Sequence, residues 1–290
     1  GGKVLLEQRD VEARGYRAGG RYAIAAMVFG NHVADGSIDL DLTLGEMRID
    51  DRNGLLPVEK EATIRDLLAN RSGVYHPTNF GADPVDIPPR GSVEPGTAFL
   101  FHPWGGIALK TVFDLLTDRD LFQAIGEDLA APLGLQDFKW WRQNPGHERN
   151  RSEYPIWNLY VSTRDLARFG QLMLQRGEWK GEQLIPGEWV DAMTSLVTPA
   201  METDTEERRS RGLGFGYQWW VWDETDPASP YAGAYTYTGS YGQYLTVLPA
   251  MDMVVAHQVF AGWYGPPERS VDWVEYKVIL DRLIAARGTP

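Results

Sequence analysis

The sequence predicts an α/β (α+β) fold in which an antiparallel sheet is flanked by helices and joined to an all-helical region. A strand-like segment near the start is followed by a long middle part with helical periodicity. After Gly212 come aromatic and β-branched runs, and then an amphipathic segment. This order predicts a sheet built from both ends of the chain. We treat residues 1–290 as a single domain, with the sheet part at about 1–20 and 212–290 and the helical part at about 21–211.

The helical middle opens with a segment, Arg21 to Ala34, that is apolar on nearly every side. Such a pattern is typical of a helix buried inside a protein. Gly19 and Gly20 stand just before it, so we expect the first backbone N–H groups of this helix to be uncovered. A short amphipathic helix is expected over 61–70. Further helices are expected near 104–117, 119–131, 163–177, 186–195 and 270–287.

Runs of aromatic and β-branched residues predict successive antiparallel strands at 215–222, 241–248 and 253–260. The run from Lys3 to Glu7 predicts a further strand, the second half of a hairpin whose first half is missing. A sheet without that first strand would keep an unpaired edge, which is normally a liability. The proline-rich segment 76–98 predicts a long loop, and loops of this length are often functional.

The composition excludes several classes of function. A net charge of −12 and the lack of a basic stripe argue against nucleic-acid binding. The chain has no cysteine, which excludes disulfides and thiolate chemistry. No apolar stretch is long enough to span a membrane. No His, Asp or Glu cluster has metal-ligand spacing, so we expect no metal and no cofactor. The acidic run from Glu202 to Arg209 predicts a solvated loop. Localisation and oligomeric state are left open.

Six segments, in order, resemble the serine β-lactamase and penicillin-binding-protein-like superfamily, in particular the class C β-lactamase-related serine hydrolases. The segments are Gly30–Asp41, Arg65–Leu68 with Arg71–His76, Pro95–Thr97, Ser162–Gly170, Gly214–Trp220 and Gly239–Gln243. The resemblance covers residues 3–287. It implies an antiparallel sheet flanked by helices, an all-helical region, and a pocket between the two parts. It also implies that the first strand of the family would precede residue 1.

The resemblance implies a serine nucleophile in a Ser-x-x-Lys motif at the start of the buried helix and a Tyr-x-Asn element. It further implies a late Lys- or His-containing triplet beside an oxyanion-binding N–H group. Aligned through Gly30, the serine position holds Gly19 and the lysine position holds Tyr22. The Tyr-x-Asn element falls on Phe101-His102-Pro103, and the late triplet falls near Tyr237-Thr238-Gly239.

These substitutions remove the groups that the family's chemistry needs. Glycine has no nucleophile, phenylalanine cannot transfer a proton, and neutral tyrosine is a poor base because its free pKa is about 10. No Ser-x-x-Lys occurs within residues 1–60. Ser37, Ser72 and Ser240 are interpreted as structural. We therefore expect that the acyl-enzyme mechanism does not operate, whereas the packing segments read as intact.

The altered pocket offers other candidates. Tyr22 is a candidate hydrogen-bond donor or general acid, and His102 a candidate base, with Tyr241 as a further catalytic candidate. In the alternative, His102 points away from the site, and both readings stay open. His76 is interpreted as structural, and His32 and His257 as core histidines. The candidate substrate-binding residues are Gly19, Gly20, Tyr75, Phe101, Pro103, Trp104, Tyr237, Gly239 and Ser240.

Three functional hypotheses follow from these residues. The first is a repurposed pocket, natural or engineered, that acts on a small aromatic or anionic molecule by acid–base rather than acyl-serine chemistry. The second is an ordinary serine hydrolase of esters or amides whose nucleophile is unrecognised. The third is a catalytically inactive homologue that binds a small-molecule ligand. The bare helix N-terminus suits a carboxylate, a phosphate or an oxyanion in each case.

Overall fold

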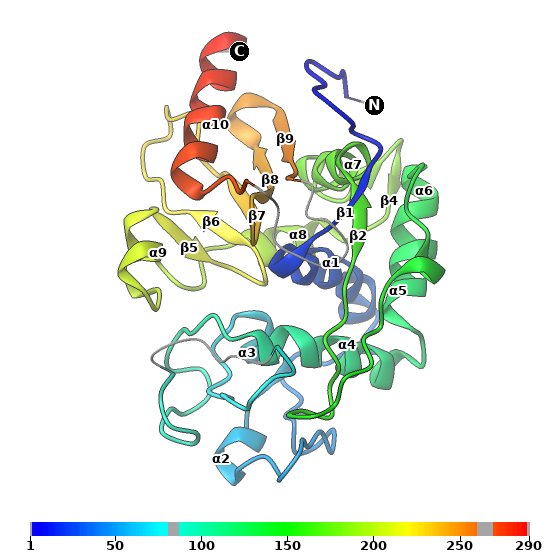
Figure 1. Ribbon diagram of the computed structural model, residues 1–290, viewed down its shortest axis with the longest axis vertical. Helices are drawn as coiled ribbons and strands as arrows, with labels where there is room; N and C mark the ends of the chain where they lie inside the picture. Colours follow the sequence, from blue (N-terminus) through cyan, green and yellow to red (C-terminus); the bar gives the residue numbers. More distant parts are fainter. Residues whose placement is uncertain (1, 81–86, 260–268, 289–290) are drawn as a thin grey trace.

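The computed structural model describes residues 2–80, 87–259 and 269–288, and it confirms the predicted fold class (Figure 1). An antiparallel sheet and its flanking helices form one part, and a helical part follows below it in Figure 1. The strands are β1 (Arg14–Tyr16), β2 (Tyr160–Ser162), β3 (Glu178–Trp179), β4 (Glu182–Gln183), β5 (Leu213–Phe215), β6 (Trp220–Trp222), β7 (Tyr235–Gly239), β8 (Gln243–Leu248) and β9 (Met253–His257).

The helices within the described residues follow the predicted order. The α-helices are α1 (Arg21–Ala34), α2 (Pro57–Lys60), α3 (Ile64–Leu68), α4 (Pro103–Thr117), α5 (Leu121–Ala124), α6 (Ala131–Leu133), α7 (Thr163–Leu174), α8 (Gly187–Thr194), α9 (Glu206–Ser210) and α10 (Trp273–Arg287). Short turns of 3-10 helix form η1 (Ala18–Gly20), η3 (Trp140–Arg142), η4 (Ala200–Glu202) and η5 (Pro249–Met251), and a π-helical turn forms η2 (Ile125–Ala130). No helix of the described chain has both the length and the apolar character needed to cross a membrane.

The main sheet has the order β5-β6-β7-β8-β9, and every neighbouring pair is antiparallel. Its two faces are covered by different helices. On β8, Leu245 contacts Gly170 of α7, whereas the hydroxyl of the next residue, Thr246, lies 2.8 Å from that of Tyr276 on α10. Successive strand residues point to opposite faces, so α7 and α10 cover opposite sides of the sheet.

The prediction of a sheet made from both chain ends is wrong for the described residues. Lys3–Glu7 is not a strand, and Val4, Leu5 and Leu6 within it are 60–66% exposed. β-propensity alone does not form a strand without a neighbouring strand to pair with. The N-terminal strand that does form, β1, pairs with β2 in a separate two-stranded sheet. The main sheet is therefore formed only by strands β5 to β9 from the C-terminal part of the chain, and β9 is one of its two edge strands.

Several predicted boundaries shift where the backbone turns. The strand expected over 215–222 divides into β5 and β6 because Gln218 has a φ of +63° and closes a turn between them. The strand expected from residue 241 begins at Gln243, since Tyr241 and Gly242 both have positive φ. The helix expected over 119–131 contains the π-helical turn η2. Phe260 and residues 81–86 of the proline-rich loop lie outside the described residues.

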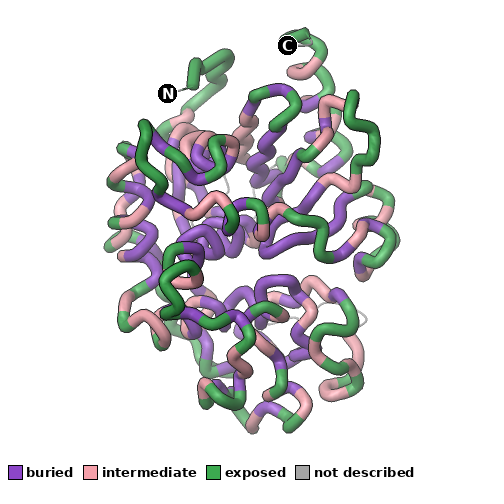
Figure 2. Tube along the Cα trace, turned by 180° about the vertical axis from the view of Figure 1, so that it is seen from behind, coloured by how far each residue is buried: buried purple, intermediate pink, exposed green. Residues whose placement is uncertain are grey.

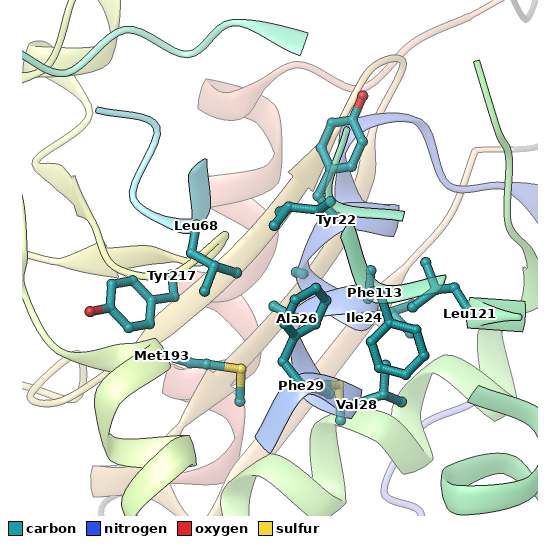
Figure 3. Close-up of a cluster of buried hydrophobic side chains, with 14 of the residues drawn as sticks. Tyr22, Ile24, Ala26, Val28, Phe29, Leu68, Phe113, Leu121, Met193 and Tyr217 are labelled. Carbon is teal, nitrogen blue, oxygen red and sulfur yellow. The ribbon is translucent and has the colours of Figure 1, made fainter. Parts of the chain in front are cut away.

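The predicted buried helix is confirmed as α1, which runs through the interior (Figures 1 and 2). Its side chains Ile24 and Phe29 lie in one cluster with Phe113 of α4 and Met193 of α8 (Figure 3). His32 is a correction, because it is half-buried near the end of α1 and its Nδ1 lies 3.0 Å from the Ser37 hydroxyl, outside the core. Residues Arg21 to Gly30 of α1 are all buried, which fixes the position of its N-terminus. The expectation of uncovered N–H groups is wrong at Gly20 and Arg21, because these groups donate to carbonyl oxygens of the preceding turn.

Asp165 at the start of α7 joins two parts of the chain. Its side chain is fully buried and accepts hydrogen bonds from the backbone N–H groups of Gln136, Asp137 and Phe138. Ser162, the N-cap of α7, accepts in turn from the Asp165 N–H group. The carboxylate thus holds the loop that follows α6 against α7.

We predict that Asp165→Ala lowers the free energy of unfolding by about 3 kcal/mol or more, because three buried N–H groups lose their acceptor. Asp191→Ala, which removes an exposed ion pair with Arg176, serves as the control and should cost about 1 kcal/mol or less. Urea unfolding followed by tryptophan fluorescence measures both. Equal losses in the two variants would show that the buried carboxylate has no special role.

Candidate functional site

The predicted site positions Gly19, Phe101 and Thr238 lie together at the start of α1. A Cβ atom built on Gly19 would lie 3.3 Å from the carbonyl oxygen of Thr238 and 3.6 Å from Cζ of Phe101. All three residues are half-buried, so they border space that is reachable from solvent. Segments that are far apart in the sequence therefore meet as the motif alignment predicted.

The next residues bring β7 against η1. A Cβ atom on Gly20 would collide with the Tyr237 ring, so this ring packs directly on the glycine backbone. Gly239 is packed just as closely. A Cβ atom built on it would lie 2.5 Å from the Arg17 carbonyl oxygen and 3.2 Å from the Cβ atom of Ala18. Ala18 has a φ of +47°, which is uncommon for a residue with a side chain. Close packing without side chains thus sets the distance between the helix N-terminus and β7.

Tyr22 is buried, with 3% of its surface exposed, and its hydroxyl accepts a 2.7 Å hydrogen bond from Nη2 of Arg21. Burial raises the pKa of Tyr22 to about 12, although the Arg21 guanidinium acts in the opposite direction. The phenol is therefore protonated at neutral pH. Its ring lies edge-on against Trp157, and a Cβ atom on Gly106 would come within 2.8 Å of it.

Phe101 is positioned by an acidic residue that the sequence interpretation missed. Its backbone N–H group donates a 3.0 Å hydrogen bond to Asp204, whose side chain is only 6% exposed and also pairs with Arg208. The Arg208 guanidinium lies 5.1 Å from the centre of the Phe101 ring. The solvated loop expected over 202–209 is therefore wrong at Thr203 and Asp204, which turn inward. The composition of this segment, acidic residues followed by two arginines, gave no signal for that difference.

His102, Trp104 and Tyr75 form a buried group beside Phe101. The Nδ1 atom of His102 accepts a 3.3 Å hydrogen bond from the Trp104 N–H group, which makes His102 the N-cap of α4, and Pro103 is the first residue of that helix. The His102 ring lies edge-on against Tyr75. Trp104 is completely buried and donates from Nε1 to Asp51 at 2.7 Å, so it faces the helical part.

Tyr241 and Ser240 lie on the turn between β7 and β8 and are exposed, Tyr241 at 40%. In this exposure they differ from Tyr22 and His102, which are both buried. The three catalytic candidates therefore occupy different surroundings: Tyr22 contacts Arg21 and Trp157, His102 caps α4, and Tyr241 stands at the surface. The structure brings the glycine positions together with Phe101 and Tyr237.

His76 belongs to a buried network near this region. Its Nδ1 atom is 3.0 Å from the Pro77 carbonyl oxygen and 3.1 Å from the Asp51 carboxylate, and its Nε2 atom is 2.8 Å from the Arg52 carbonyl oxygen. Oxygen atoms thus lie within hydrogen-bond distance of both ring nitrogens. These contacts link separate loops. Within the described ranges, no three His, Asp or Glu side chains are placed to hold a metal ion.

Arg17 and Arg21 are two further residues that the sequence interpretation did not single out. Their side chains are 0% and 1% exposed, and neither forms an ion pair with a described residue. Arg21 donates to the Ala18 carbonyl oxygen at 2.5 Å and lies over the rings of Tyr22 and Trp157. The region around η1 therefore carries two buried cations, and the chain's net charge of −12 gave no indication of them.

Comparisons with known proteins agree with this architecture. A family model described as Beta-lactamase matches residues 23–280. An uncharacterized protein of Alkalihalophilus pseudofirmus is 30% identical over 116 residues, which are 38% of this chain and 32% of that protein. The matched part thus spans about a third of that curated relative.

Solved structures share the fold at low sequence identity. A Bacillus anthracis protein provisionally assigned as a 6-aminohexanoate-dimer hydrolase has a TM-score of 0.66 at 17% identity, over 97% of this chain and 74% of its own. A Bacteroides dorei protein provisionally assigned as a β-lactamase has a TM-score of 0.67 at 17% identity, over 96% of this chain and 90% of its own. A β-lactamase of Mycobacterium bovis has a TM-score of 0.64 at 15% identity, over 98% of this chain and 91% of its own.

We predict that Gly20→Ala destabilises the fold by about 1–3 kcal/mol, because the added methyl group overpacks against the Tyr237 ring. Gly19→Ala is the matched control: its Cβ atom would lie 3.3 Å from the Thr238 carbonyl oxygen, a tight contact that a small shift relieves, so the cost should be smaller than that of Gly20→Ala. Thermal unfolding of both variants measures the difference. If Gly19→Ala were the more damaging change, β7 and η1 would not be packed as described.

Proposed function

Because this chain belongs to the β-lactamase family, we propose that it uses the hydrolase scaffold for acid–base rather than acyl-serine chemistry on a small aromatic or anionic molecule. One observation carries the proposal. Gly19 stands just before the buried helix, near Thr238 and Phe101, at the position that the motif spacing assigns to the nucleophile. The pocket floor has lost its nucleophile, while the helix and strand that frame it are retained.

Tyr22 is proposed as the proton donor of this pocket. Its oxygen accepts from Arg21, which leaves its own proton available for a ligand. Since its pKa is about 12, Tyr22 cannot serve as a base at neutral pH. His102 is proposed as the second proton carrier, with Nδ1 occupied by the Trp104 N–H group, so the neutral ring carries its proton on Nε2. Tyr241 and the residues around Gly19 are proposed as ligand contacts.

A second candidate function is ligand binding without turnover. It is favoured by the separate surroundings of Tyr22, His102 and Tyr241, since acid–base catalysis needs its groups within reach of one substrate. An ordinary serine hydrolase is the remaining alternative. It would require a nucleophile such as Ser240, which is exposed beside Gly239 on the β7–β8 turn.

We predict that neither a fluorophosphonate nor penicillin acylates the protein, because no activated serine stands at the start of α1. Intact-protein mass spectrometry after prolonged incubation measures this, with an active class C β-lactamase as the positive control. A stoichiometric adduct on the wild-type chain would overturn the proposal and favour the serine hydrolase. Peptide mapping of such an adduct would identify its nucleophile.

We also predict that the chain hydrolyses 4-nitrophenyl acetate without a trapped acyl intermediate, and that Tyr22→Phe lowers kcat by about 10²-fold. Tyr231→Phe, whose hydroxyl instead bonds to Asp281 of α10, should leave the rate unchanged. Because the folded-state pKa of Tyr22 is raised to about 12, its contribution is constant across neutral pH and is lost only as the pH rises towards 12. Absence of turnover, together with saturable ligand binding, would favour the binding protein.

A further inference from the structure

The side chain of Asp51 is fully buried, and its carboxylate is the common acceptor for three segments of the chain. Oδ1 accepts hydrogen bonds from the backbone N–H groups of Arg52 and Glu153, each at 2.6 Å. Oδ2 accepts from Nε1 of Trp104 and from the hydroxyl of Ser152, each at 2.7 Å. A buried carboxylate is stable only where donors face its oxygens. The loop at Asp51, the first turn of α4 and the segment at 152–153 are therefore held at one point.

Trp104 connects this carboxylate with His102. Its ring Nε1 donates to Asp51, and its backbone N–H group donates to Nδ1 of His102 at 3.3 Å. Both Trp104 and His102 are buried. An indole N–H is only ever a donor, so Trp104 cannot exchange roles with its acceptor. Anchoring of Trp104 by Asp51 therefore sets the direction from which an N–H group reaches the His102 ring.

Asp51 also contacts the loop that carries Tyr75. Nδ1 of His76, which is 2% exposed, lies 3.1 Å from Oδ2 of Asp51. The preceding residue, Tyr75, lies edge-on against the His102 ring, with the ring centres 5.9 Å apart. Two neighbours of His102, the Trp104 N–H group and the Tyr75 ring, thus belong to elements that meet at Asp51.

The segment held at 152–153 continues to Tyr22. Further along it, the buried ring of Trp157 lies edge-on against that of Tyr22, with the centres 5.6 Å apart. Nε1 of Trp157 donates to the carbonyl oxygen of Ile107 on α4 at 3.2 Å. The contacts that begin at Asp51 therefore extend to both residues proposed above as proton carriers.

We propose that Asp51 is a positioning residue of the site, which holds Trp104 and the His76 loop and thereby fixes the orientation and the tautomer of His102. With the Trp104 N–H group on Nδ1, the neutral imidazole carries its proton on Nε2. Asp51 acts through Trp104 rather than on a ligand, because its side chain is fully buried and both oxygens already have donors. This inference rests on the proposed function for the role of His102 and adds the residue that orients it.

Asp51→Asn tests the proposal because it turns one of the two acceptor atoms into a donor. If the amide oxygen keeps the two backbone N–H groups, the NH₂ group faces Nε1 of Trp104, which is also a donor. Trp104 must then shift, and His102 loses the partner that fixes its tautomer. ¹⁵N NMR of the histidine rings, at a pH where the His102 ring is neutral, distinguishes the tautomers, and His102→Gln identifies the signals. We expect two well-separated ring nitrogen signals in the wild type, and signals that move towards each other in Asp51→Asn as both tautomers become populated.

Asp165→Asn is the matched control, since Asp165 is an equally buried carboxylate that accepts three backbone N–H groups beside α7. Thermal unfolding should show a lower Tm for both variants, but only Asp51→Asn should change the His102 signals. Unchanged His102 signals in Asp51→Asn, or an equal change in Asp165→Asn, would overturn the proposal and leave Asp51 as an anchor of the fold alone.

If Asp51→Asn does not fold, Trp104→Phe gives the second measurement, because it removes the Nε1 donor and keeps the backbone N–H group. Its control is Trp189→Phe, which removes another buried indole donor, to the Ala26 carbonyl oxygen of α1. The His102 signals should change in the first variant only, and an equal result in both would again contradict the role of Asp51. These signals do not depend on turnover. A wild type without turnover would therefore count against the proposed chemistry, whereas only the His102 signals decide on Asp51.

Discussion

The contact between the N-terminus of α1 and strand β7 is the constraint on which the site depends. α1 is buried by helices on several sides, and its first residues reach the sheet where Gly20 meets the Tyr237 ring. Because neither Gly19 nor Gly20 carries a side chain, the backbone of η1 approaches β7 closely. Phe101 also lies at this junction, with its Cζ atom 3.6 Å from a Cβ atom built on Gly19.

The fold was predictable because its signals are local and periodic. The apolar stretch from Arg21 to Ala34 gives α1 with its observed bounds, and Ser162 with Asp165 marks the start of α7 as an N-cap and its partner. Sheet membership was less predictable, because pairing depends on a distant partner. Lys3–Glu7 has a strand-like composition but no pairing neighbour, whereas the short segment Arg14–Tyr16 pairs with β2.

The candidate site was predictable in its positions but not in its chemistry. Motif spacing placed Gly19, Phe101 and the 237–239 strand near one another, and the structure brings them together. Spacing could not indicate that His102 caps α4 or that Asp204 holds the Phe101 backbone, because both depend on side-chain direction. The buried arginines were equally hidden, since Arg17 and Arg21 look like ordinary surface residues in a polar stretch of sequence.

Arg21 has a consequence for how the pocket responds to its surroundings. Aromatic rings surround this guanidinium, and its hydrogen bonds go to neutral oxygens. A lysine in such a place could give up its proton and so alternate between charged and neutral forms. A guanidinium cannot, and aromatic faces, unlike carboxylates, do not titrate. Arg21 therefore keeps its positive charge over the whole pH range in which the protein stays folded, and its contribution to the electrostatic potential of this region does not change with pH.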